Sequence, residues 1–285
     1  MAEIIDGKLV STAVREKIAK ETAAFKAETG IVPGLAVILV GNNPASAVYV
    51  RNKHKACAEV GMNSIQIYMP EDTSEQELLS KIEELNSDQT VHGILVQLPL
   101  PSHICEEKII SSISPNKDVD AFHPVNVGKI MTGNYSFLPC TPAGVMKLLD
   151  FYNIEIKGKK CVVVGRSNIV GKPMSLLLLE RNGTPTICHS KTNDLASVTQ
   201  EADILVVAIG RANFIGADAV KEGAVVIDVG INRLPDGKLA GDVNFDEVSG
   251  KASFITPVPG GVGPMTIAVL LENTLTAAKN SIKPR

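Results

Sequence analysis

The chain has 285 residues and a formal net charge of −3, with 45% hydrophobic residues, 21% charged residues and no Trp. This length exceeds the usual size of one domain, so two domains, each with its own core, are expected. The slightly negative charge and the low aromatic content of 4% give no reason to expect nucleic acid or an anionic membrane surface as a partner, and a small-molecule ligand fits better.

The cysteines and the start of the sequence indicate the cellular compartment. The five cysteines are scattered, odd in number and without a Cys-x-x-Cys pair, which predicts reduced, partly buried thiols and no metal site. No basic flank precedes an apolar core at the start, and no apolar run is long enough to cross a bilayer. We therefore expect a cytoplasmic protein.

The first half of the chain alternates between helical and strand patterns. Apolar residues at helical spacing predict a helix over residues 8–29, which ends at Gly30. The elements predicted after it are strands at 35–40, 65–68 and 93–96, and helices at 46–60 and 74–85. This β/α alternation predicts a mainly parallel sheet with helices on its faces.

A second β/α series begins near residue 140. A linking helix around residues 145–149 precedes a new first strand at 159–164, and the β-branched runs that follow predict further strands at 185–188, 204–208, 225–229 and 254–255. An amphipathic helix at about 265–278 is expected to return to the first domain. The fold prediction is two α/β domains with a cleft between them, the second Rossmann-like.

A glycine turn in the second series is a candidate phosphate site. Residues 162–171 join an apolar strand to a helix start, where a dinucleotide pyrophosphate meets backbone N–H groups and a helix dipole. The spacing is G-R-S-x-x-x-G rather than the usual dinucleotide fingerprint, so a plain strand-to-helix turn is the alternative.

The end of the next strand favours NADP over NAD. An NAD site places Asp or Glu against the ribose hydroxyls, whereas this chain has Cys-His-Ser-Lys at residues 188–191. Arg166 can bind a 2′-phosphate through its planar guanidinium group, and Ser190 can donate a hydrogen bond to it. Lys191 is a further candidate contact.

The first series carries a possible proton-handling pair. Tyr49 and Lys53 are four residues apart on a predicted helix and therefore share one face. The alternative is a solvated helix with a surface lysine. Gln97 ends a buried strand and is followed by prolines, at the carboxyl edge of the sheet where ligands bind, although a glutamine there can also simply cap a loop.

Two loops complete the set of candidate sites. Residues 118–120 place two carboxylates two positions apart, and residues 257–266 form a rigid, glycine-lined loop. A loop with so few side chains suits backbone contact with a ligand, and a structural turn is the alternative.

Six segments together resemble the bifunctional methylenetetrahydrofolate dehydrogenase/cyclohydrolase family of the FolD type. They occur in the family's order over essentially the whole chain: NPASAVYVRNKHK at 43–55, GILVQLPLP at 93–101, KDVDAFHP at 117–124, PCTPAGV at 139–145, VVGRSNIVGKP at 163–173 and TPVPGGVGPMT at 256–266. Residue 121 departs from the family, which usually has glycine where this chain has Ala121, and the extra methyl group is expected to tilt the pterin pocket slightly.

The resemblance implies a bifunctional enzyme of one-carbon metabolism. It would oxidise 5,10-methylenetetrahydrofolate with NADP to the methenyl cation and hydrolyse that cation to 10-formyltetrahydrofolate, which serves purine biosynthesis, as a cytoplasmic homodimer. Residues 1–140 with the helix at 265–285 would form the catalytic, folate-binding domain, and residues 141–264 the NADP-binding domain. The implied site residues are Lys53, Tyr49 and Gln97 for catalysis; Asp120, Tyr49, Gly260, Gly261, Val262 and Pro264 for the substrate; and Gly165, Arg166, Ser167, Ser190 and Ile231 for NADP.

The two reactions make different demands on these residues. Hydride transfer needs mainly alignment with the nicotinamide, because the nitrogens that flank the reacting carbon stabilise its cation. Hydrolysis gains about 10²- to 10⁴-fold from a base. Lys53 fits that role if its surroundings favour the neutral amine, with Gln97 accepting a hydrogen bond from it and Tyr49 ordering the water or the lysine. Asp120 suits the amino-pyrimidinone edge of the pterin.

Two other interpretations remain open. A monofunctional methylenetetrahydrofolate dehydrogenase would not need Lys53 and Gln97. A non-catalytic dinucleotide-sensing protein would keep the turn at Gly165 but would not need Tyr49, Lys53 and Asp120 together.

Overall fold

The computed structural model describes residues 1–282, except for the side chain of Ala45. The chain forms two compact units, which we name after their sheets. The six-stranded unit comprises Met1–Thr12 and Pro139–Thr266, and the three-stranded unit comprises Ala13–Leu138 and, of the described residues, 267–282. Helices α1 (Gly7–Thr29) and α10 (Val262–Ser281) contribute residues to both units.

The three-stranded unit follows the predicted alternation. Strand β2 (Gly34–Val40) lies between β3 (Asn63–Met69) and β4 (Gly93–Val96), and both pairings are parallel. The helices between and after them are α2 (Pro44–Glu59), α3 (Glu75–Ser87), α4 (Glu106–Ser112) and α5 (Pro124–Met131). A capping box between Ser74 and Glu77 fixes the start of α3.

Aliphatic side chains cover the three-stranded sheet on both faces. Residues 36, 38 and 40 of β2 belong to one buried cluster with residues of α3 and α4. Successive side chains of a strand point to opposite faces, so residues 35, 37 and 39 point to the other side, and α2 contacts β2 and β3. Burial on both faces explains why β2 is apolar throughout.

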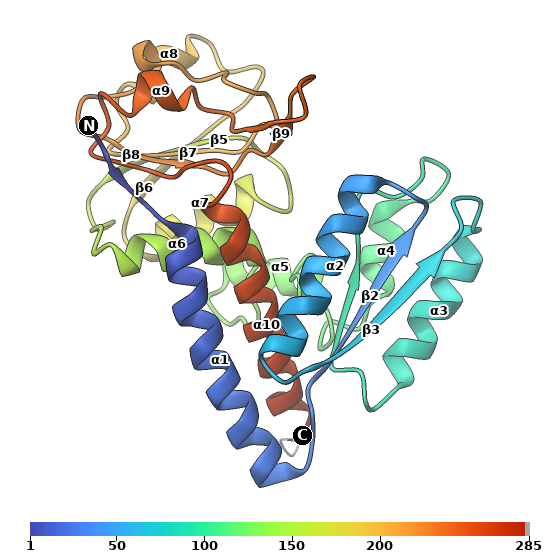
Figure 1. Cartoon of the computed structure of the whole chain (residues 1–285). Coiled ribbons are helices and arrows are strands. Elements are labelled where there is room, and N and C mark those ends of the chain that lie inside the picture. Colours follow the sequence, from blue (N-terminus) through green and yellow to red (C-terminus); the bar gives the residue numbers. More distant parts are fainter. Residues whose placement is uncertain (283–285) are drawn as a thin grey trace. The chain divides into compact units, whose positions relative to one another are not determined.

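The six-stranded unit has the strand order β1-β11-β8-β7-β5-β6, with every pairing parallel. Its strands are β1 (Glu3–Ile4), β5 (Lys160–Val164), β6 (Thr184–Cys188), β7 (Ile204–Val207), β8 (Val225–Asp228) and β11 (Phe254–Ile255). The other elements are α6 (Cys140–Phe151), α7 (Gly171–Glu180), α8 (Leu195–Thr199), the 3-10 helix η1 (Ala217–Ala219), α9 (Phe245–Val248) and the antiparallel pair β9 (Asn232–Arg233) and β10 (Leu239–Ala240). Figure 1 shows α8 and α9 on one face of this sheet and α6 and α7 on the other.

The prediction of two α/β units with parallel sheets is confirmed, as is the return of the last helix to the unit that begins the chain's β/α alternation. The first twelve residues group with the six-stranded unit, whereas the predicted boundary assigned residues 1–140 to one domain. The reason is that Glu3 pairs with Phe254 of β11, and Gly7 approaches Gly261 so closely that a Cβ at residue 7 would lie 1.7 Å from the carbonyl oxygen of residue 261.

The cysteines are free thiols, as predicted from their spacing, and Cys105 is the exposed member of the five. Burial raises the pKa of Cys57 to about 12 and that of Cys161 to about 11. Within residues 1–282, the helices are all too short or too polar to span a bilayer.

Candidate functional site

Lys53 and Gln97, predicted from separate motifs, meet in the three-stranded unit. Helix α2 begins where the Asn43 side chain accepts the backbone N–H of Ser46 at 3.1 Å, and Lys53 follows two turns later. The Lys53 side chain is buried, with 9% of its residue surface exposed, and its Nζ donates to Oε1 of Gln97 at 3.0 Å. Tyr49, one turn earlier, is 39% exposed. The interpretation of Lys53 as a solvated surface lysine is therefore wrong.

The orientation of the Gln97 amide is fixed by its own surroundings. Its backbone N–H donates to the carbonyl oxygen of Ile38 in the adjacent strand at 2.8 Å. Its side-chain Nε2 donates to the carbonyl oxygen of Leu98 at 2.8 Å. A carbonyl oxygen accepts but cannot donate, so the NH₂ group must face Leu98 and the amide oxygen must face Lys53.

The neighbour of Lys53 on the next turn of α2 is neutral. Cys57 is fully buried, and burial raises the pKa of its thiol to about 12. The thiol therefore provides no negative charge that would hold the lysine in its ammonium form.

The two carboxylates of residues 118–120 have different environments. Asp118 is buried and accepts the backbone N–H groups of Phe122 and His123 at 3.2 and 2.8 Å and the Asn126 side-chain amide at 2.8 Å. Burial raises the pKa of this carboxyl group. Asp120 is half-buried and lines a small cavity next to Leu98. Asp118 thus holds the turn, and Asp120 is the carboxylate placed near the end of β4.

Ala121 has a backbone conformation that normally favours glycine. Its φ is +57° and its side chain is fully buried. Its N–H donates to the Asp118 carbonyl oxygen at 3.1 Å, which closes the turn. The left-handed region costs an L-residue roughly 1–2 kcal/mol, so this turn gives a physical reason for the glycine that the resemblance leads us to expect at residue 121.

The glycine turn of the six-stranded unit depends on two close backbone approaches. Gly165 has φ +134°, and a Cβ there would lie 2.3 Å from the Ala208 carbonyl oxygen at the end of β7. A Cβ on Gly171 would lie 2.2 Å from the carbonyl oxygen of Gly165. The Ser167 hydroxyl accepts the N–H groups of Val170 and Gly171 at 3.1 and 3.3 Å. The turn and the start of α7 therefore form one tightly packed piece.

The predicted NADP residues lie at one edge of this sheet. β5 and β6 are parallel neighbours with Val164 opposite Cys188, so Arg166 and Ser190 both follow their strands at the carboxyl edge. Arg166, Ser167 and Ser190 are at least partly exposed. His189 and Lys191 belong to a local turn in which the His189 ring accepts the N–H of Lys191 at 3.1 Å.

The remaining predicted residues lie around the start of α10. Ile231, after β8, is 43% exposed, and its Cδ1 would lie 3.5 Å from a Cβ on Gly263. Gly261 and Val262 are buried, whereas Gly260 and Pro264 are partly exposed. Gly261 packs against Gly7, so this part of the glycine loop has a structural role.

Two buried carboxylates at the same edge escaped the sequence analysis. Asp228 ends β8, and Asp242 follows the β9–β10 pair. Both are almost completely buried and accept several backbone N–H groups. The sequence features that could have indicated them are an Asp at the end of the apolar run 225–228 and another Asp directly after Gly241.

Comparison with known proteins covers both units. Residues 5–120 match the family model described as tetrahydrofolate dehydrogenase/cyclohydrolase, catalytic domain, and residues 139–282 match the NAD(P)-binding domain of the same family. Proteins named bifunctional protein FolD from Acetivibrio thermocellus and Geobacillus thermodenitrificans are 59% and 60% identical, over 99% and 98% of this chain and of each relative.

Solved structures agree over the full length. The bifunctional FolD enzyme of Campylobacter jejuni is 54% identical with a TM-score of 0.96, and the alignment covers 99% of this chain and 100% of that one. The Trypanosoma brucei enzyme, solved with NADP and an inhibitor, is 39% identical with a TM-score of 0.95, covering 99% of both chains. On these matches, the chain belongs to the tetrahydrofolate dehydrogenase/cyclohydrolase family.

Proposed function

We propose that this chain is an NADP-dependent methylenetetrahydrofolate dehydrogenase that also acts as a methenyltetrahydrofolate cyclohydrolase. Relatives with bifunctional names match it from end to end, and family models for the catalytic and the NAD(P)-binding domain both match. The observation that carries the second activity is the hydrogen bond of 3.0 Å between the buried Lys53 amine and Gln97.

In the dehydrogenase half, the six-stranded unit binds NADP at the carboxyl edge of its sheet. The turn at Gly165 presents backbone N–H groups to the pyrophosphate, together with Ser167. Arg166 and Ser190 bind the 2′-phosphate, a role supported by their exposure at neighbouring strand ends and by the lack of a carboxylate in residues 188–191. Ile231 offers an exposed aliphatic surface to the nicotinamide.

In the hydrolase half, Lys53 is the base that removes a proton from the attacking water. Burial disfavours a charged amine, and the cation formed by hydride loss repels an ammonium group further. Gln97 accepts a hydrogen bond from the amine and fixes its direction, while the more exposed Tyr49 orders the water or the lysine. The neutral thiol of Cys57 adds no competing negative charge to this arrangement.

The three-stranded unit binds the folate. Asp120 accepts hydrogen bonds from the amino-pyrimidinone edge of the pterin, and the Asp118 network holds the turn that carries it. In the glycine loop of the six-stranded unit, the partly exposed Gly260 and Pro264 are the members that can offer backbone contacts to a ligand, whereas the buried Gly261 and Val262 hold the loop in place. We also propose that the protein acts as a cytoplasmic homodimer and that its formyl product serves purine biosynthesis.

Two spectroscopic assays, one for each reaction, test this function. With methylenetetrahydrofolate and NADP we expect NADPH to form, and with methenyltetrahydrofolate we expect its absorbance to decay faster than in buffer. A failure to reduce NADP under saturating conditions would favour the dinucleotide-sensing protein. NADPH formation with methenyltetrahydrofolate decaying only at the uncatalysed rate would indicate a monofunctional dehydrogenase.

A further inference from the structure

Asp242 organises the backbone at the carboxyl edge of the six-stranded sheet. Its Oδ2 accepts the N–H groups of Ile209 and Gly210 at 2.7 and 3.0 Å, and its Oδ1 accepts the N–H of Arg211 at 2.8 Å and the Asn232 side-chain amide at 2.9 Å. The side chain is completely buried. One carboxylate therefore holds three consecutive residues after β7 and one residue after β8.

The main chain of Asp242 extends the same network. Its carbonyl oxygen accepts the N–H groups of Phe214 and Ile215 at 2.7 and 3.0 Å. The loop that follows β7 is thus fixed at both of its ends by a single residue. Charge-assisted hydrogen bonds of the carboxylate are about twice as strong as neutral ones, so the side chain provides the stronger half of this anchor.

Asp228 supports Asp242 from the end of β8. It is 3% exposed and accepts the N–H groups of Gly230, Asp242 and Val243, at 3.0, 2.9 and 2.9 Å. Burial raises the pKa of Asp228 to about 6, so at a pH well above this value its carboxylate is ionised and can accept all three bonds.

Two glycines allow the carboxylates to approach the backbone. A Cβ on Gly230 would lie 2.2 Å from the carboxyl carbon of Asp242, and a Cβ on Gly241 would lie 1.8 Å from Oδ2 of Asp228. Any larger residue at either position would displace a carboxylate. The segment that carries Ile231 therefore packs directly against the Asp242 carboxylate.

We propose that Asp242 is a positioning residue for the nicotinamide half of NADP, with Asp228 as its support. Asp242 fixes the loop of Ile209–Arg211 on one side and the segment of Gly230–Asn232 on the other, the two strand ends that follow β7 and β8. Ala208, which directly precedes Ile209, also packs closely against the turn at Gly165. The inference rests on the proposed function, because it presumes that NADP binds at this edge.

The test is Asp242→Asn, which keeps the shape of the side chain but turns an NH₂ group toward backbone N–H donors. We expect the dehydrogenase kcat/KM for NADP to fall about 10- to 100-fold, since small misplacements of reacting groups cost that much. The kinetic isotope effect with substrate deuterated at the methylene carbon should rise, because hydride transfer becomes slower. Cyclohydrolase activity, assayed directly on methenyltetrahydrofolate, should stay within about twofold.

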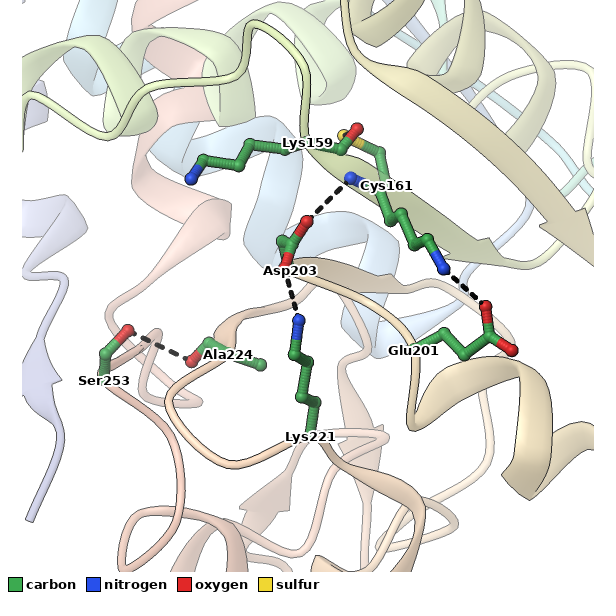
Figure 2. Close-up of polar contacts among 8 residues, drawn as sticks. Lys159, Cys161, Glu201, Asp203, Lys221, Ala224 and Ser253 are labelled. Carbon is green, nitrogen blue, oxygen red and sulfur yellow. Dashed lines mark hydrogen bonds and ion pairs between the residues drawn. The ribbon is translucent and has the colours of Figure 1, made fainter.

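Asp203→Asn is the matched control. Asp203 precedes β7 at the opposite edge of the sheet, where it accepts the backbone N–H of Lys160 at 2.9 Å and the Lys221 ammonium at 2.6 Å (Figure 2). Like Asp242, Asp203 is a carboxylate that accepts hydrogen bonds from residues next to other strands, but it lies far from the edge where NADP is predicted to bind. Its loss should lower thermal stability and leave the KM for NADP and the isotope effect unchanged.

The outcomes separate the possibilities. The positioning role is overturned if folded Asp242→Asn has the same kcat/KM for NADP and the same isotope effect as Asp203→Asn. It is also overturned if the dehydrogenase and cyclohydrolase activities of Asp242→Asn fall by the same factor. If Asp242→Asn does not fold, Asn232→Ala removes one donor to the same carboxylate, and unchanged dehydrogenase kinetics in that variant overturn the role as well. A wild-type protein that does not reduce NADP refutes the proposed function itself, before any variant is compared.

Discussion

The amide oxygen of Gln97 faces the amine of Lys53 at 3.0 Å because the other end of the amide is held by the backbone of Leu98. Lys53 has a directed acceptor, and this geometry makes its proposed role as base testable by substitutions at both residues.

Lys53→Met is expected to keep the fold and lose hydrolysis. Methionine replaces the buried stem without the amine, and loss of a base costs about 10²- to 10⁴-fold in rate. The decay of methenyltetrahydrofolate absorbance measures this loss. Lys55→Met is the control, since the Lys55 side chain is 79% exposed and forms a long ion pair with Glu59. Substantial cyclohydrolase turnover in Lys53→Met would remove the assignment.

Gln97→Glu is expected to slow hydrolysis at neutral pH by about tenfold or more, because a carboxylate about 3 Å from the amine favours the ammonium form. The rate should recover as the pH rises and the lysine loses its proton, so the pH–rate profile of the variant should shift toward alkaline pH. A profile that coincides with that of the wild type would show that residue 97 does not influence the protonation of Lys53.

Arg166→Ala is expected to raise the KM for NADP far more than the KM for the folate, and to reduce the preference for NADP over NAD. The physical reason is that alanine cannot form the charge-assisted hydrogen bonds that an arginine makes to a phosphate. Initial rates with both cofactors measure the effect. Arg181→Ala, which removes a positive charge paired with Asp150 just after α7, serves as the control. Equal shifts in both Michaelis constants would assign Arg166 a different role.

Ala121→Val is expected to destabilise the protein by about 3 kcal/mol, through overpacking and through a β-branched residue at positive φ. Ala268→Val is the matched control, because Ala268 is equally buried but lies within the helix α10. The difference between the two denaturation midpoints reports the backbone strain at residue 121. Equal midpoints would mean that the positive φ of Ala121 carries little cost.

Thiol labelling of the native protein should modify Cys105 rapidly and the other four cysteines only on unfolding. Those four are buried, and burial raises the thiol pKa of Cys57, Cys161 and Cys188, so little reactive thiolate is present. Mass spectrometry after a short exposure to iodoacetamide counts the modified sites. Early labelling of Cys57 would indicate that the region beside Lys53 opens readily.

Elements with a distinct local apolar pattern were predictable from the sequence, including the short strands β4 and β11, and short elements without such a pattern were not. α1 was located to within a residue because its apolar residues recur at helical spacing, and β4 was located because it is an unbroken apolar run. β1 has only two residues and exists through its pairing with β11, about 250 positions away, so local sequence cannot reveal it. α4 and α5, with seven and eight residues, are too short for a helical period to stand out.

The candidate site was predictable to the same extent. Motifs identified Lys53 and Gln97 separately. Only the folded chain shows that these two residues, 44 positions apart in the sequence, are joined by a hydrogen bond. Asp228 and Asp242 carry no motif, because their role depends on N–H groups contributed by three different loops. At residue 121 the sequence showed an unusual alanine, and the structure adds that this alanine occupies a left-handed turn.

The interleaving of the two units along the chain constrains how the protein is made. The buried Asn273 amide of α10 donates to the carbonyl oxygens of Val119 and Leu138 at 2.8 and 2.9 Å. The three-stranded unit, although its strands β2–β4 leave the ribosome before β5–β11, cannot finish its core until the final helix has been synthesised. The hydrophobic surface that α10 covers therefore stays exposed on the nascent chain while the second sheet is synthesised. Protection by chaperones during translation is most needed over that interval.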